Sequence, residues 1–484
     1  MAGLGKRRPP RQRSGVSGLA HKRPSDTRRA YQTDTSDELP DELEIQGLSH
    51  DGRGIARSPA GKTLFVEGAL PGERVRVAVH RTRKRYDEAH LRELIEAAPT
   101  RVTPPCPYIE RCGGCDLQHL ELDAQRRHKA VVLSELLARQ GVEVDLERIE
   151  VLASDDVAYR RRARLGVRVD ADGGIHLGFR ARRSHRLVSV ESCTVLVPEL
   201  SSLLAPLHQQ LASLEAPRQV GHLELLASDG QVTLVIRQLR EQPADLARWR
   251  AWADERGIAV GVLAGREQVR FEWLVTPPRG LQVTVPSARG PLSLGVGPSD
   301  FLQANAQVNQ RMIETALDWL GTPRRVDEPL LDLFAGIGNF SLPLAASGYA
   351  VSAVEGSPEM TARLADNAAG ADLDVAALQG NLHDEGQVAR LLRTHDAEVV
   401  VLDPPREGAE ALCRALAKST VSRVLYIACD PATLSRDAAH LLQGGYRLQR
   451  VAMADMFVHT SHLESMVLFE RQGPSPRQGV RKDG

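Results

Sequence analysis

The sequence predicts an α/β protein in three parts: a small N-terminal β-barrel, a mixed α+β central domain and a C-terminal domain built on a largely parallel sheet. From residue 330 onward, short apolar runs alternate with helical segments, which is the pattern of βαβ units. Between residues 43 and 95, β-rich runs are separated by glycine-containing turns, as in a small barrel. The length of 484 residues suits about three domains.

The composition is that of a soluble globular protein. Hydrophobic residues make up 42% and charged residues 26% of the chain. No run approaches the roughly 18 apolar residues that span a membrane, and the Arg-rich stretch 1–30 has no apolar core, so it is not a secretory signal. Six cysteines in a chain of this length do not form a disulfide scaffold. We therefore expect a reduced, cytoplasmic protein in which clustered cysteines bind metal.

The charge is unevenly distributed, although 62 Lys and Arg balance 62 Asp and Glu. Residues 1–35 hold nine basic and two acidic side chains, and both ends are rich in Gly, Pro, Ser and Arg. We expect disordered basic tails over 1–36 and 472–484, which either attract phosphate or only keep the chain in solution. Residues 157–186 hold nine Arg and two Asp. A basic belt inside an otherwise acidic body favours contact with nucleic acid.

Apolar and β-rich runs locate the individual elements. N-terminal strands are expected at 43–45, 63–66 and 75–79. A central helix is expected at 126–140, with strands at 164–169, 187–190, 222–226 and 232–238. C-terminal strands are expected at 330–334, 351–354, 375–378, 399–402, 424–428 and 465–469, with helical segments at 340–346, 360–369, 409–417 and 432–442. The resulting domains are 37–98, 99–295 and 296–471.

A glycine-rich turn after the first C-terminal strand predicts an adenosine site. Gly336 and Gly338 let the backbone approach a ligand, and Glu355, 19 positions after Gly336 and at the next strand end, can accept hydrogen bonds from ribose hydroxyls. A dinucleotide fingerprint needs a third glycine where Ser341 stands. The pattern therefore favours S-adenosylmethionine, which has no pyrophosphate, over NAD.

Two later strand ends carry reactive groups. Asp403 precedes two prolines directly after strand 399–402, and Cys429 follows strand 424–428. Open α/β sheets bind ligands at the carboxyl ends of their strands. A structural cysteine is expected inside an element as apolar filler, which suits Cys413 in helix 409–417 but not Cys429. Cys429 is therefore the candidate nucleophile.

The remaining four cysteines predict a metal site. Cys106, Cys112 and Cys115 lie within ten residues, and Cys193 is the only other cysteine before the C-terminal domain. Four thiolates suit zinc or an iron–sulfur cluster. Three close ligands with a distant fourth suit a cubane cluster at least as well as zinc, so the spacing leaves the metal open.

Five stretches, taken in order, resemble the RNA uracil-5-methyltransferase family over about residues 40–470. They are 301–305, 331–341, 403–406, 426–431 and 455–464. Residues 48–54 are similar to this family's TRAM domain, an RNA-binding barrel of OB type. The resemblance implies a Rossmann-like, S-adenosylmethionine-dependent methyltransferase domain, and it is nearest to the iron–sulfur members that act on a uridine of 23S rRNA. Val458 departs from the family, which has proline there.

The resemblance also implies roles for residues. The family's S-adenosylmethionine contacts match Gln303, Phe334, Asn339, Glu355, Asn381 and Asp403, and its [4Fe–4S] ligands match Cys106, Cys112, Cys115 and Cys193. Cys429 matches the nucleophile and Glu464 the general base. Carbon 5 of uracil is a weak nucleophile, so a thiolate must first add to carbon 6, and a base must later remove the carbon-5 proton. The target base must leave its stack to reach both groups.

We therefore expect an enzyme that transfers a methyl group from S-adenosylmethionine to carbon 5 of a 23S rRNA uridine. We expect it to act as a monomer with rRNA as its partner and without membrane contact. The related tRNA enzyme lacks the barrel and the cluster cysteines, and a second ribosomal relative lacks the barrel. The alternatives are the same reaction on another rRNA or tRNA uridine, or an iron–sulfur RNA-binding protein without catalysis.

Overall fold

Six strands form the N-terminal sheet of the computed structural model, which describes residues 42–266 and 269–471. The expected tails 1–36 and 472–484 lie outside the described residues. Leu64 and Val66 of the fourth strand pack with Val75 of the fifth in the core of this unit. The expected β-rich N-terminal unit is confirmed, whereas β6 was missed because most of its residues are exposed. In spatial order the strands are β1 (Leu43–Glu44), β5 (Arg74–Thr82), β6 (Tyr86–Glu96), β4 (Thr63–Glu67), β3 (Gly54–Arg57) and β2 (Gly47–Leu48).

A seven-stranded sheet forms the central domain. Its neighbouring strands are antiparallel except β12 and β13, which are parallel and are joined through helix α4 (Pro243–Arg256). α3 (Leu204–Ser213) and α4 bury Leu207 and Trp249 in the core that they share with the sheet. The sheet order is β10 (Leu187–Ser189), β9 (Ile175–Arg180), β8 (Arg162–Val169), β11 (Val220–Ser228), β12 (Gln231–Gln238), β13 (Ala259–Ala264) and β14 (Arg270–Val275).

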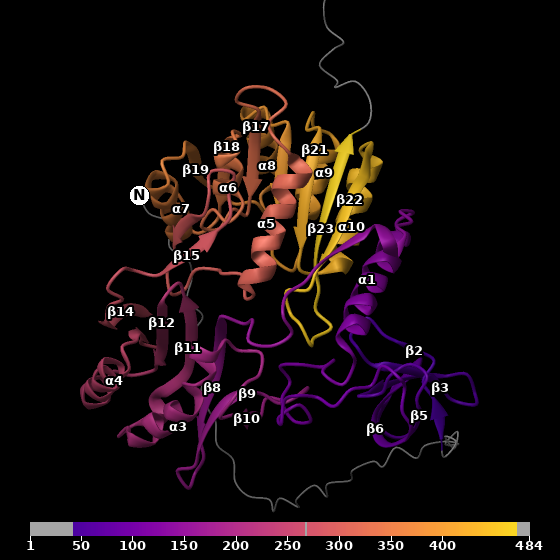
Figure 1. The fold of residues 1–484 in the computed structure, drawn as a ribbon, viewed down its shortest axis with the longest axis vertical. Helices are drawn as coiled ribbons and strands as arrows, with labels where there is room; N and C mark the ends of the chain where they lie inside the picture. Colours follow the sequence, from indigo (N-terminus) through magenta and orange to yellow (C-terminus); the bar gives the residue numbers. More distant parts are fainter. Residues whose placement is uncertain (1–41, 267–268, 472–484) are drawn as a thin grey trace, which may run out of the picture.

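An eight-stranded sheet forms the C-terminal domain, above the other two sheets in Figure 1. Its order is β19 (Val375–Gln379), β18 (Ala350–Glu355), β17 (Pro329–Leu333), β20 (Val399–Leu402), β21 (Arg423–Ala428), β23 (Glu464–Arg471), β22 (Tyr446–Ala454) and β7 (Ile149–Leu152). The strands from β19 to β21 are parallel, and β23 is antiparallel to both neighbours. All six expected strands are confirmed to within two residues. The chain order reverses between β17 and β20, so the ends of these strands flank the switch point where such sheets bind ligands.

From residue 306 onward, all but the first of the helices around this sheet begin after one of its strands. The hairpin β15 (Gln282–Val285) and β16 (Leu292–Gly295) leads from the central domain into the first of them. Within residues 42–266 and 269–471, no helix is both long enough and apolar enough to cross a membrane. The helices are α5 (Ala306–Leu320), α6 (Ser341–Ala346), α7 (Pro358–Gly370), α8 (Glu385–Thr394), α9 (Glu410–Ala417) and α10 (Pro431–Gln443).

One segment expected in the central domain packs on the C-terminal sheet instead. Helix α1 (Leu122–Ala138) buries Leu133 and Leu137 in the same core as Leu434 of α10. β7 adds a parallel strand to the edge of the sheet, with Ile149 opposite Val451. The expected division at residue 295 therefore does not describe residues 122–152, because a pairing between segments so far apart leaves no local sequence pattern.

Candidate active site

The glycine loop between β17 and α6 is a tight turn that Glu355 closes. Phe334, Gly336 and Gly338 have left-handed backbones, with φ of +66°, +58° and +100°. The Glu355 carboxylate, at the end of β18, accepts the backbone N–H groups of Gly336 at 3.0 Å and Ser357 at 2.8 Å. Glu355 therefore fixes the loop.

Four of the six residues expected to contact S-adenosylmethionine line one cavity beside this loop. They are Gln303, Phe334, Asn339 and Asp403. Asn339 is oriented by two reciprocal amide hydrogen bonds with Asn309 of α5, both 2.9 Å long. The carboxyl ends of β17 and β20 and the segment before α5 thus supply the walls of the cavity.

The other two expected contacts do not line this cavity. Glu355 contacts the loop through its bond to Gly336. Asn381 is exposed after β19, and its side chain accepts the N–H of His383 at 3.1 Å. The His383 ring lies 6.3 Å from that of Phe334, so Asn381 belongs to the loop next to the cavity.

Two acidic groups lie at the ends of the two central strands: Asp332 is fully buried, and Asp403 is half-buried at the cavity. Asp332 in β17 accepts a hydrogen bond from the Ser341 hydroxyl. Burial raises the pKa of the Asp332 and Asp403 carboxyls to about 7 each, and the charge of Asp332 further raises that of Asp403. A cationic ligand in the adjacent cavity would stabilise both carboxylates, because an opposite charge offsets the loss of solvation.

Cys429 and Glu464 meet at the same edge of the sheet. Cys429 follows β21 and Glu464 begins β23, and the register that pairs Ala428 with Ser465 continues to place them opposite each other. Burial, followed by the nearby Glu464 and Asp403 carboxylates, raises the pKa of the Cys429 thiol to about 12. Burial and Asp403 raise the pKa of Glu464 to about 8. The free site thus pairs a neutral thiol with a carboxyl group that exchanges its proton just above neutral pH.

Arg406 is a site residue for which the sequence alone predicts no role. Its positive charge opposes the increase in the pKa of both Cys429 and Glu464. It also lines the cavity that the cluster cysteines surround. The available signal was its position directly after the strand-end turn 403–405, at the edge of the sheet where ligands are expected. Cys413, by contrast, is fully buried in α9, as expected of a packing residue.

The four expected metal ligands gather around a second cavity. Cys106, Cys112, Cys115 and Cys193 all line it. Burial raises the pKa of Cys115 to about 12, and the neighbouring thiols add to this increase. Backbone N–H groups approach the sulfurs, from Gly114 to Cys112 at 3.4 Å and from Val195 and Leu196 to Cys193. Among the described residues, no group of three or more His, Cys, Asp and Glu side chains has the arrangement of a metal site.

Two models of known protein families match the chain. The tRNA (uracil-5-)-methyltransferase family model matches residues 121–472, and the TRAM domain model matches residues 42–91. The chain belongs to the RNA uracil-5-methyltransferase family. The family expected from the five motif stretches is therefore confirmed, together with the TRAM domain at its N-terminal end.

Two curated relatives are similar over their whole length. The 23S rRNA (uracil(1939)-C(5))-methyltransferase RlmD of Halomonas elongata is 60% identical over 100% of both chains. RlmD of Chromohalobacter salexigens is 54% identical over 99% of this chain and 97% of its own. Among solved structures, the Pyrococcus abyssi tRNA (uracil-54, C5)-methyltransferase in complex with S-adenosyl-L-homocysteine superposes with a TM-score of 0.69 at 21% identity. It covers 89% of this chain, and 99% of its own chain is matched, so this family member shares the fold.

Proposed function

We propose that this chain transfers a methyl group from S-adenosylmethionine to carbon 5 of a 23S rRNA uridine of U1939 type, forming 5-methyluridine. The observation that carries the proposal is the juxtaposition of Cys429 and Glu464 at the sheet edge beside the glycine-loop cavity. The two full-length relatives named for this reaction support the ribosomal substrate.

The reaction requires a nucleophile that is later expelled. The Cys429 thiolate bonds to carbon 6 of uracil, and the electron pair of the 5,6 double bond moves to the carbon-4 oxygen as an enolate. Carbon 5 then bonds to the methyl carbon, whose bond to the sulfonium breaks to leave S-adenosylhomocysteine. Glu464 takes the carbon-5 proton, the double bond re-forms, and Cys429 departs as a thiolate.

The charges of the site suit this order of events. Asp403 is the carboxylate that most raises the pKa of Glu464 after burial itself. A sulfonium placed beside Asp403 offsets that negative charge, so binding of S-adenosylmethionine favours ionisation of Glu464 before the methyl group is transferred. Arg406 is the cation that favours the Cys429 thiolate.

We assign the S-adenosylmethionine site to the glycine-loop cavity and its surroundings. Gln303, Phe334, Asn339 and Asp403 form its walls. Glu355 is proposed to hold the ribose, and the exposed Asn381 to close the site from the neighbouring loop. Phe334 adds an aromatic ring to the lining of the cavity, and the reciprocal pair of Asn339 with Asn309 keeps one amide in a fixed orientation.

We assign the second cavity to a [4Fe–4S] cluster held by Cys106, Cys112, Cys115 and Cys193. Four thiols that enclose one cavity and repel one another as thiolates suit a cationic metal centre, and N–H groups directed at the sulfurs are typical of such sites. The methyl transfer needs no electrons, so a cluster would supply structure here rather than redox chemistry.

The remaining parts are proposed to position the RNA. The TRAM domain (37–98) and the Arg-rich strands of the central domain (99–295) are the proposed RNA-binding surfaces, with the tails as additional phosphate contacts. The protein is proposed to act as a cytoplasmic monomer. The Pyrococcus abyssi tRNA enzyme matches 89% of this chain, so the architecture alone does not separate ribosomal from transfer RNA.

A parallel assay tests the function. Methyl transfer from radiolabelled S-adenosylmethionine is measured on unmodified 23S rRNA and on unmodified tRNA, and the product is mapped by mass. We expect label as 5-methyluridine in 23S rRNA alone. Cys429→Ala should lower the rate at least about 1,000-fold, because carbon 5 is no longer activated, whereas Cys413→Ala should keep the label.

The other outcomes are informative. Label in tRNA alone would retain the chemistry and replace the substrate. The absence of label from both RNAs, with the cluster intact, would favour an iron–sulfur RNA-binding protein without catalysis.

A further inference from the structure

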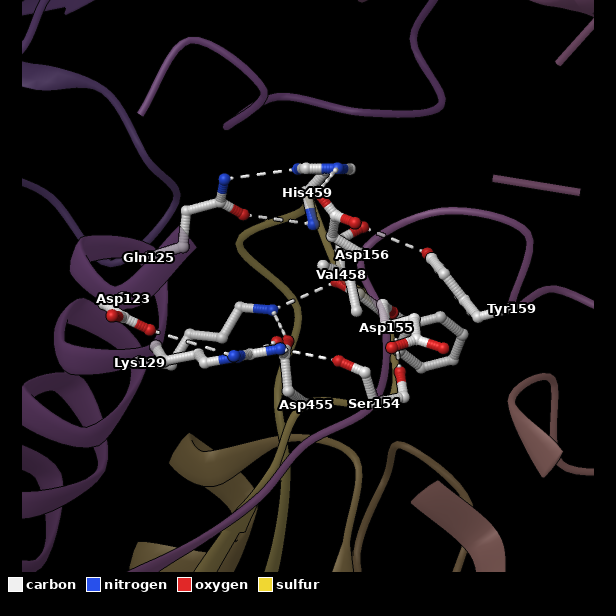
Figure 2. Close-up of polar contacts among 12 residues, drawn as sticks. Asp123, Gln125, Lys129, Ser154, Asp155, Asp156, Tyr159, Asp455, Val458 and His459 are labelled. Carbon is white, nitrogen blue, oxygen red and sulfur yellow. Dashed lines mark hydrogen bonds and ion pairs between the residues drawn. The ribbon is translucent and has the colours of Figure 1, made fainter. Parts of the chain in front are cut away.

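The loop that leads into Glu464 is held by helix α1. This loop, residues 455–463, joins β22 to β23. Figure 2 shows Lys129 of α1 donating to the Asp455 carboxylate, at 2.6 Å. The same ammonium group donates to the Phe457 carbonyl at 3.0 Å. Both side chains of the ion pair are 1% exposed, so the pair is sealed from water between the helix and the loop.

Two further residues of helix α1 contact the loop. Arg126 donates to the second Asp455 oxygen at 3.2 Å. Gln125 binds His459 twice: its amide oxygen accepts the His459 N–H at 3.1 Å, and its nitrogen lies 3.2 Å from Nδ1 (Figure 2). His459 has a φ of +66°, a backbone conformation that residues other than glycine rarely adopt, so its neighbours must hold it in place.

The opposite side of the loop is held by other segments. The Tyr159 hydroxyl donates to the carbonyl of Val458, which is fully buried where the family has proline. Asp116 accepts the N–H and the hydroxyl of Ser461 at 2.7 and 2.8 Å. Tyr159 of the central domain and the segment 106–117, which carries three of the cysteines and is called the cysteine segment below, therefore hold the side of the loop that α1 does not.

Asp455 lies next to the ladder end at which the proposed base stands. In the register of β22 and β23, Ala454 pairs with Glu464, and this is the last pair before the loop. Terminal pairs fray unless the residues beyond them are held. Asp455 is held by its own N–H on the Leu152 carbonyl at 2.8 Å and by its carboxylate, which accepts from Lys129 and from Arg126. The ion pair therefore secures the position of Glu464 opposite Cys429.

We propose that Lys129 is a positioning residue for the reaction: through Asp455 it holds the end of the β22–β23 ladder so that Glu464 can take the carbon-5 proton. The inference rests on the proposed function, in which Glu464 resolves the covalent adduct. A buried ion pair adds little net stability compared with apolar packing of the same volume, which suits a role in orientation. Loss of the pair slows resolution of the adduct and spares S-adenosylmethionine binding and methyl transfer.

The test compares Lys129→Met with Lys129→Arg in the full-length enzyme on unmodified 23S rRNA. For Lys129→Met we expect first-turnover methyl transfer within about 3-fold of the unaltered enzyme, steady-state turnover at least about 10-fold lower, and a denaturant-stable enzyme–RNA adduct. Lys129→Arg, which retains a donor to Asp455, should restore turnover to within about 3-fold. Arg127→Met removes an exposed cation from the same helix and should behave like the unaltered enzyme.

A double variant keeps the test independent of folding. Lys129→Met alone leaves the Asp455 carboxylate buried without this partner, so Lys129→Met/Asp455→Asn, which removes both charges, is measured beside it. The proposal is overturned if the double variant turns over like the unaltered enzyme. It is equally overturned if S-adenosylmethionine affinity and first turnover fall in proportion to steady-state turnover, which indicates a general loss of structure.

Glu464→Gln separates this inference from the proposed function. If the adduct accumulates in Glu464→Gln but not in the double variant, the role of Lys129 is overturned and the proposed function stands. No adduct in Glu464→Gln removes the proposed base, and the role of Lys129 with it.

Discussion

At the scale of single residues, the position of protons governs the site. Burial raises the pKa of the Cys429 thiol to about 12 and that of Glu464 to about 8, so both groups are largely protonated at neutral pH in the free enzyme. Asp403 raises both pKa values and Arg406 lowers both. A cation bound at Asp403 would therefore lower both pKa values, and an anion bound at Arg406 would raise them, so either ligand changes the proposed nucleophile and the proposed base together.

Breakdown of the covalent adduct should depend on pH through Glu464. The ionised fraction of a base rises about tenfold per pH unit below its pKa and levels off above it. We expect the breakdown rate to rise up to about pH 8 and then to become flat, because the reacting form is the carboxylate. The measurement forms the adduct by rapid mixing and follows release of methylated RNA between about pH 6 and about pH 9.5.

Two variants check this assignment. Glu464→Gln should slow the breakdown at least about 100-fold and abolish its pH dependence. Glu470→Gln, at the other end of the same strand, should keep the full profile. A Glu464→Gln enzyme with an unchanged profile would place the base elsewhere.

At the scale of elements, a strand could be predicted when its own sequence shows why it forms, and not when its formation depends on distant segments. β20 and β21 were predicted because they are buried along their whole length and their sequences are nearly continuous apolar runs. β22 was missed because polar residues such as Arg447 and Arg450 interrupt its first half. Residues at strand ends were placed at one edge because parallel strands end together. Neither the exposure of Asn381 nor the pairing of β7 with β22 has a local signal.

In the glycine loop, the backbone requires glycine more strictly at position 338 than at position 336. A Cβ on Gly338, where φ is +100°, would lie 2.2 Å from Leu342 Cδ1, whereas a Cβ on Gly336, where φ is +58°, meets nothing within 4 Å. Gly336→Ala should therefore cost about 1 kcal/mol of unfolding free energy, and Gly338→Ala about 2–4 kcal/mol with weaker S-adenosylmethionine binding. Chemical denaturation and calorimetric titration measure both effects. Equal costs would show that Leu342 moves aside freely.

At the scale of the whole molecule, the cysteine segment joins all three units. The Gly113 N–H donates to the Arg180 carbonyl of β9 at 2.9 Å. The Arg182 guanidinium donates to the Cys115 carbonyl at 2.8 Å. Leu117 packs on Gly52 of the N-terminal unit, and Asp116 binds Ser461 in the loop before Glu464. A centre held by these cysteines would therefore fix the relative placement of RNA-binding surfaces and catalytic edge.

Cys193→Ser gives the sharpest test of that role, because Cys193 is the one proposed ligand from a different segment. Metal-binding energy at a structural site is folding energy, so we expect loss of the broad absorption near roughly 400 nm that iron–sulfur clusters show and a Tm lower by about 10 °C. Affinity for S-adenosylmethionine should stay within about 3-fold, since the glycine-loop cavity is built from β17, β20 and the segment before α5. Cys413→Ser, buried in α9, should lose stability yet keep the absorption. An unchanged spectrum and Tm in Cys193→Ser would remove the cluster assignment, whereas zinc found by metal analysis would retain the ligands and change the metal.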